Sequence, residues 1–88
     1  MSTRAQPVIT ASQLGTLLQS ARKSRKLTQA QLGARLGLSQ TRISELELAP
    51  GTLSVDQLLA ICAQLGLQLS LQRRDDNLPA PGTRAALW

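Results

Sequence analysis

A group of polar side chains between residues 40 and 45 has the chemistry and the spacing needed to hydrogen-bond to the edges of DNA bases. These residues are Gln40, Thr41, Arg42, Ser44 and Glu45. At helical spacing they occupy the outward part of a wheel whose opposite side carries Ile43, Leu46 and Glu47. A short helix with so few apolar residues suits one that offers a polar face to a DNA groove. Glu45 can accept a hydrogen bond from a cytosine amino group, and Arg42 is expected at the flank of this face.

Residues that commonly carry catalysis or bind metals are scarce in the sequence. The 88-residue chain has no His and no Tyr, and its one Cys, Cys62, lies among aliphatic residues. This composition disfavours an ordinary zinc site, excludes an intrachain disulfide and provides no base beside the thiol. We therefore expect no enzyme, no metal and no cofactor, and we expect Cys62 to be a buried, unreactive core residue.

Positive charge is concentrated in the same half of the chain as the polar group. The formal net charge is +5, which favours a polyanion as partner. The basic residues expected to contact phosphates are Lys23, Arg25, Lys26 and Arg35. After residue 49 basic and acidic residues balance, so the excess belongs to the half with the polar group. The alternative interpretation is that these side chains form a solvated face without a ligand.

The segment that must position these side chains, residues 27–48, is predicted to form two short helices joined by a tight turn. Thr28 and Gln31 have the spacing of a capping box at the start of the first helix. Gly37 can adopt the left-handed conformation that ends a helix, and Ser39 can cap the second helix. This arrangement is a helix-turn-helix.

Two further helices are predicted, one before and one after the helix-turn-helix. Their capping-box pairs are Thr10 with Gln13 and Ser54 with Gln57. Gly66 is expected to close the last helix. The sequence thus predicts an all-α domain of four to five helices over residues 10–66, preceded by an N-terminal arm of residues 1–9.

The helix-turn-helix carries T-Q at the start of its first helix, G-L-S-Q at its turn, and then I-S and Glu47. With these residues at this spacing, the chain resembles the Xre/Cro group of phage-type repressors over residues 14–65. The resemblance implies a lambda-repressor-like fold that binds DNA through the second helix of the motif. It further implies that Gln29 contacts a phosphate and that Gln40 contacts an adenine edge.

The resemblance also implies one contact between helices and shows one departure. It predicts an ion pair between Arg22 and Glu47 that locks the first helix to the recognition helix, with two independent surface charges as the alternative. The inward position of Glu47 favours the pair, because an unpaired inward carboxylate is costly. The departure is Gly33, where the family usually has Ala at the closest approach of two helices. Glycine there costs about 1 kcal/mol in helix propensity.

Residues 67–74 change from a helical to an alternating pattern. Leu67, Leu69 and Leu71 alternate with polar residues, which is typical of a half-buried strand. A single strand needs a partner for its backbone groups, and the same strand of a second copy can pair with it antiparallel across a two-fold axis. We therefore predict a C-terminal β-strand that pairs across a homodimer. The alternative is an extended tail that runs over its own domain.

A short Xre-type domain that ends in one such strand and a polar tail resembles the HipB-like antitoxins. The resemblance implies a homodimeric repressor that binds double-stranded operator DNA, regulates its own operon and binds a HipA-like kinase toxin. One alternative is a stand-alone Xre/phage-type repressor. Another is an interaction module that sequesters a toxin and for which DNA binding is secondary or lost.

The last segment, residues 75–88, is predicted to be a disordered tail, because it contains Pro79, Pro81 and Gly82 and few apolar residues. It ends on Trp88, the single aromatic residue of the chain. Tryptophan is among the strongest anchors at protein interfaces. We therefore predict that Trp88 inserts into a pocket of the toxin. The alternatives are a tail that folds back on its own domain and a terminus that proteases recognise.

The sequence contains no uninterrupted apolar run long enough to span a bilayer, and its N-terminus lacks the apolar core of a secretory signal. We therefore expect no membrane partner. The expected location is the cytoplasm, with association to the nucleoid when the protein binds its operator.

Overall fold

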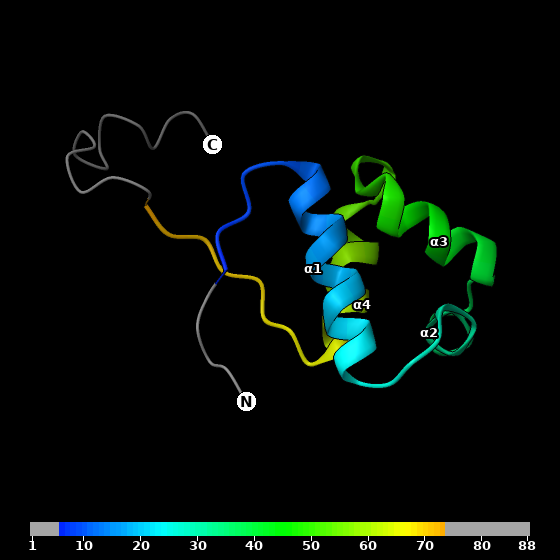
Figure 1. Ribbon diagram of the computed structural model, residues 1–88. Coiled ribbons are helices and arrows are strands. Elements are labelled where there is room, and N and C mark those ends of the chain that lie inside the picture. The colour runs from blue at the N-terminus through cyan, green and yellow to red at the C-terminus, as the bar shows by residue number, and fades with distance from the viewer. Residues whose placement is uncertain (1–5, 74–88) are drawn as a thin grey trace.

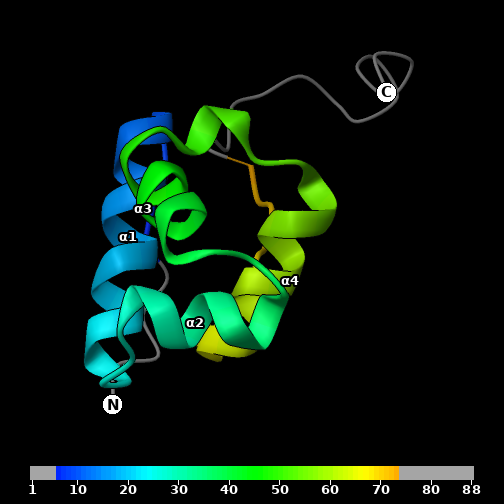
Figure 2. The same ribbon diagram turned by 90° about the vertical axis from the view of Figure 1, so that its right-hand side faces the viewer.

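The computed structural model describes residues 6–73 of the chain, and these form an all-helical fold (Figure 1). Its elements are α1 (Ala11–Ser24), α2 (Gln29–Leu36), α3 (Gln40–Leu48), the 3₁₀ helix η1 (Pro50–Thr52) and α4 (Val55–Leu65). Helix α3 contacts α1 and α2, and α4 contacts the same two helices from another side (Figure 2). The predicted helix-turn-helix of four to five helices is confirmed.

Each α-helix begins at a hydroxyl side chain that replaces a missing backbone hydrogen bond. Thr10, Thr28 and Ser54 accept from the backbone N–H of a glutamine three residues later, and that glutamine's side chain accepts from the cap residue's own N–H. Ser39 caps α3 by accepting from the Arg42 N–H at 3.0 Å. Each such cap typically contributes about 1 kcal/mol, so these local signals define where the helices start.

The helices also end largely where the glycines predict. Gly37 and Gly66 end α2 and α4 in the left-handed conformation, with φ of 71° and 70°. The end of α1 differs, because Lys26 adopts this conformation with φ of 59°. There the Leu27 N–H donates to the Arg22 carbonyl oxygen at 3.1 Å. Lys26 therefore occupies a position where glycine is the least strained residue.

The core lies where the inward faces of the four α-helices meet. Its buried residues are Leu18, Leu32, Ile43, Leu46, Ile61 and Leu65. Cys62 is buried beside them, and desolvation by burial raises the pKa of its thiol. The Cys62 thiol is therefore a neutral apolar group at neutral pH.

No strand forms within residues 6–73, so the predicted strand at 67–74 is not seen in the single chain. A β-strand is defined by backbone hydrogen bonds to a second strand, and residues 67–73 have no such neighbour in this one chain. They leave the helical body beyond α4 (Figure 1). The predicted arm up to residue 5, Arg74, the tail of residues 75–88 and Trp88 lie outside the described residues.

None of the helices that the structure describes is long and apolar enough to cross a membrane. Across residues 6–73, no three His, Cys, Asp or Glu side chains come together in a way that could hold a metal ion.

Candidate nucleic-acid interface

Helix α3 buries one side and leaves the other side polar and accessible. Ile43 and Leu46 are each only 1% exposed and fix the inward side. The outward residues are Gln40, Thr41 and Glu45, which are exposed, and Arg42 and Ser44, which are half-buried. The five predicted base readers therefore lie together on the surface of one helix, and the core holds that helix from behind.

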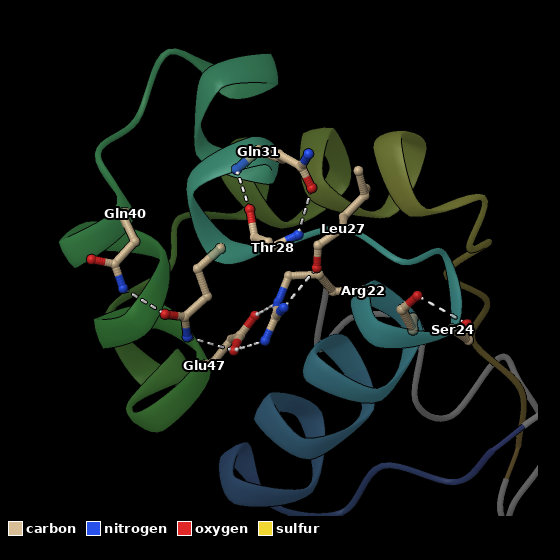
Figure 3. A network of polar contacts seen from close by, with 9 residues as sticks. Arg22, Ser24, Leu27, Thr28, Gln31, Gln40 and Glu47 are labelled. Atoms are coloured by element: carbon tan, nitrogen blue, oxygen red, sulfur yellow. Dashed lines mark hydrogen bonds and ion pairs between the residues drawn. The ribbon is translucent and has the colours of Figure 1, made fainter.

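The structure brings Arg22 of α1 and Glu47 of α3 into a two-bonded ion pair (Figure 3). Arg22 Nε donates to Glu47 Oε2 at 2.7 Å, and Nη2 donates to Oε1 at 3.2 Å. Arg22 Nη1 also donates to the Leu27 carbonyl oxygen at 2.7 Å. Arg22 is only 6% exposed. Its buried guanidinium therefore links α1 to α3 and to the loop that precedes α2. Removing either partner would leave a buried charge uncompensated.

The ion pair continues outward through two glutamines. Gln29 Nε2 donates to Glu47 Oε1 at 3.0 Å, and Gln40 Nε2 donates to Gln29 Oε1 at 2.6 Å. A continuous polar chain therefore runs from Arg22 through Glu47 and Gln29 to Gln40 at the surface. Figure 3 shows Arg22, Glu47 and Gln40 in this network. No buried side-chain nitrogen or oxygen in the described part of the chain lacks a partner, so this network is satisfied.

Sequence reasoning missed three contacts that Gln29, Gln40 and Arg42 make. It placed Gln29 and Gln40 on DNA through the family resemblance and did not foresee that Gln40 donates to Gln29 or that Gln29 donates to Glu47. Eighteen residues separate Gln29 from Glu47, and no local spacing rule connects them. It also did not foresee that Arg42, predicted at the flank of the outward face, has its Nη1 3.4 Å from Glu45 Oε1. Arg42 and Glu45 have the (i, i+3) spacing of neighbours on a helix surface, so this pair could have been predicted from the sequence.

The four basic residues predicted to contact phosphates are exposed, but they differ in their surroundings. Lys23 is in the last turn of α1, Lys26 is in the loop that follows, and Arg35 is in the last turn of α2. The Arg25 side chain differs because its guanidinium packs on Gly66 at the end of α4. There it lies close to the carbonyl end of a helix, where a cation is stabilising.

A polar groove of about 330 Å³ opens between α1 and α3. Ser12, Thr16 and Gln19 line it from α1, and Ser44 and Glu47 line it from α3. Its single ionisable side chain is the carboxylate of Glu47, which is already paired with Arg22. The groove therefore offers neutral hydrogen-bonding groups and no surplus positive charge.

Comparisons with known proteins agree with the helix-turn-helix fold. The helix-turn-helix family HTH_3 matches residues 18–72. A chain from the structure of a HipA–HipB–O2–O3 complex is 24% identical, covers 81% of this chain and 100% of its own length, and has a TM-score of 0.73. A chain from a complex of a HipB variant with an O2 20mer is 25% identical over 82% of this chain and 100% of its own, with a TM-score of 0.73. A HipB–O4 20mer complex gives 24% identity, coverage of 81% and 100%, and a TM-score of 0.72. No curated protein sequence matches the chain.

Proposed function

The chain belongs to the helix-turn-helix family HTH_3, and on this premise we propose that it is a sequence-specific DNA-binding repressor that reads operator DNA with α3. The observation that carries the proposal is the polar network that holds Gln40 at the surface from a buried ion pair. Such support fixes the orientation of a side chain before its ligand arrives, so less entropy is lost on binding.

The network leaves Gln40 with the groups that an adenine requires. One N–H of its amide donates to Gln29 Oε1, and the second N–H and the carbonyl oxygen take no part in the network. That donor and acceptor match N7 and the N6 amino group of adenine in the major groove. Gln29 likewise uses one N–H on Glu47 and has a second for a phosphate oxygen. Thr41 and Ser44 are proposed to contact neighbouring base edges.

Lys23, Lys26 and Arg35 are proposed to contact phosphates on either side of the reading helix. Their charges face solvent, and no described ion pair neutralises them. Binding should therefore weaken steeply as salt concentration rises, because each phosphate contact releases counterions from the duplex. Arg25 is proposed to combine a weaker phosphate contact with its packing on Gly66.

We propose that the active form is a homodimer joined through residues 67–74. Leu67, Leu69 and Leu71 are 40%, 49% and 91% exposed in the single chain, although they alternate as in a half-buried strand. Antiparallel pairing of two copies would bury this row and satisfy the backbone groups on its edge. A two-fold dimer would then place its recognition helices about 34 Å apart, in successive major grooves.

We further propose that the repressor is the antitoxin of a HipBA-like pair, which regulates its own operon and binds a HipA-like kinase toxin. The likeness in fold to chains from HipB complexes with DNA and with HipA supports this proposal. Trp88 is proposed as the anchor for the toxin. Trp88→Ala should weaken binding to the proposed kinase toxin, while DNA binding stays the same. Unchanged toxin affinity in that variant would disprove the anchor.

The decisive test for DNA binding is a footprint of the full chain on the DNA upstream of its own gene. The proposal predicts protection of two half-sites about one helical turn apart. The protein concentration needed for half-maximal protection should rise with salt concentration. No protection, together with tight association with the neighbouring gene product, would replace the proposal with the toxin-sequestering module.

A further inference from the structure

Two oppositely charged side chains lie together on the face of α3 that is proposed to enter the groove. Arg42 Nη1 and Glu45 Oε1 are 3.4 Å apart, and their side chains are 32% and 60% exposed. An exposed pair of this kind contributes little to the stability of a fold. The pair also uses one donor of Arg42 and one oxygen of Glu45, so most of their hydrogen-bonding capacity is available to a ligand.

A carboxylate on this face needs a reason, because a DNA groove is lined by negative charge. An isolated Glu45 would be repelled by the phosphates as α3 enters the groove. Arg42 lies beside Glu45 at the (i, i+3) spacing and offsets that charge. Glu45 can then act as an acceptor in the groove, which neither Lys nor Arg can do.

We infer that Arg42 and Glu45 act as one unit that reads a single G·C base pair in each half-site; this inference rests on the proposed DNA-binding function. In the major groove, cytosine presents one donor, its N4 amino group, and guanine beside it presents two adjacent acceptors, O6 and N7. Glu45 Oε2 accepts from cytosine, and the unused guanidinium donors of Arg42 bind the two acceptors of guanine.

The other base pairs match this unit less well. Adenine also offers a donor to Glu45, but its N6 group separates the two neighbouring acceptors of an A·T pair, so the guanidinium fork loses one of its bonds. A pair in the reversed orientation places acceptor atoms in front of the carboxylate, and they repel it. Arg42 and Glu45 therefore select by attraction to one base pair and by repulsion from its reverse.

The test is selection of binding sites from a random duplex DNA library with the full chain and with the variants Glu45→Gln and Arg42→Gln. The parent chain is expected to enrich a site with one fixed G·C pair near the adenine that Gln40 reads. Both variants should lose on the order of tenfold in preference at that single position and keep the rest of the site. Arg35→Gln is the matched control, and it should weaken binding to all sequences without changing any base preference.

Each outcome has a defined meaning. An unchanged base preference in both variants overturns the inference, and so does a parent site without a fixed G·C pair. A response in only one variant shows that the two residues do not read as a unit. If the parent chain enriches no sequence at all, the proposed DNA-binding function itself fails. Circular dichroism of each variant ensures that a lost preference does not reflect unfolding.

Discussion

Two Arg–Glu pairs in this chain have similar chemistry and very different environments. Arg22 and Glu47 form theirs with side chains that are 8% and 5% exposed, whereas Arg42 and Glu45 form theirs in contact with solvent. In the buried pair, the lost hydration of each charge is offset only by the partner and its hydrogen bonds. In the exposed pair, water hydrates the remaining charge when its partner is removed.

The first prediction follows from this contrast. Glu47→Ala should lower the free energy of unfolding by about 3–5 kcal/mol, because it leaves the buried Arg22 guanidinium without its counterion. Glu45→Ala, the matched change at the exposed pair, should cost about 0–1 kcal/mol. Urea unfolding of both variants measures the difference. Equal effects would mean that the Arg22–Glu47 pair does not hold α1 to α3.

At the scale of the elements, α1 and α3 come into close contact at Gly15. A Cβ atom there would meet the Glu47 carbonyl oxygen and would lie 3.2 Å from Pro50 Cγ. Both neighbours are held in place, one as helix backbone and one as a buried proline ring. The packing of α3 on α1 therefore depends on the absence of a side chain at residue 15.

The second prediction is that Gly15→Ala destabilises the fold, although alanine is the better helix former. Overpacking at this contact should cost about 1–3 kcal/mol and displace α3 from α1. Gly51→Ala is the control, since a Cβ atom at Gly51 has nothing within 4 Å. Thermal unfolding should give a clearly lower midpoint for the Gly15 variant alone. A stabilised Gly15→Ala protein would show that helix propensity outweighs the contact.

The third prediction concerns the strained loop between α1 and α2. Because Lys26 has φ of 59°, Lys26→Gly should raise the free energy of unfolding by up to about 1 kcal/mol. The same change should weaken DNA binding and reduce the salt slope by about one unit, if Lys26 contacts a phosphate. Lys23→Gln is the control for loss of charge without a change in backbone strain. A stabilised variant with an unaltered salt slope would place Lys26 on the solvated face.

The helix boundaries could be predicted from the sequence because they are set within a few residues. Thr28 and Gly37, for example, act on backbone groups in the adjoining turn. The left-handed Lys26 could not be predicted that way, since no glycine marks the end of α1 and the turn is closed by the backbone bond from the Leu27 N–H to the Arg22 carbonyl oxygen. The bond from Gln29 to Glu47 joins two helices and likewise needs the folded arrangement.

At the scale of the whole molecule, the proposed function depends on two copies. A single recognition helix contacts only a few base pairs, whereas a two-fold dimer reads two half-sites at a fixed spacing. The segment proposed to join the copies, residues 67–74, was predicted from its alternation alone. Sequence reasoning could not establish its pairing, because the proposed hydrogen-bond partner is a segment of a second copy.

The fourth prediction tests this pairing. Leu69→Lys should separate the proposed dimer. The two-fold axis would place one lysine from each copy in the apolar interface, so two charges would be buried there. Ser70→Lys, on the opposite face of the same segment, should leave the dimer intact. Sedimentation velocity of both full-length variants distinguishes a dimer from a monomer. A dimeric Leu69→Lys protein would show that another surface joins the copies.

Whether α3 reads base edges through Gln40 can be measured by the affinity of Gln40→Ala for two DNA duplexes. One duplex carries the footprinted operator and the other is random DNA of equal length at the same salt concentration. The variant should lose about 1–3 kcal/mol of binding free energy on the operator and almost none on random DNA. An equal loss on both duplexes, or no loss on the operator, would mean that Gln40 does not read a base edge.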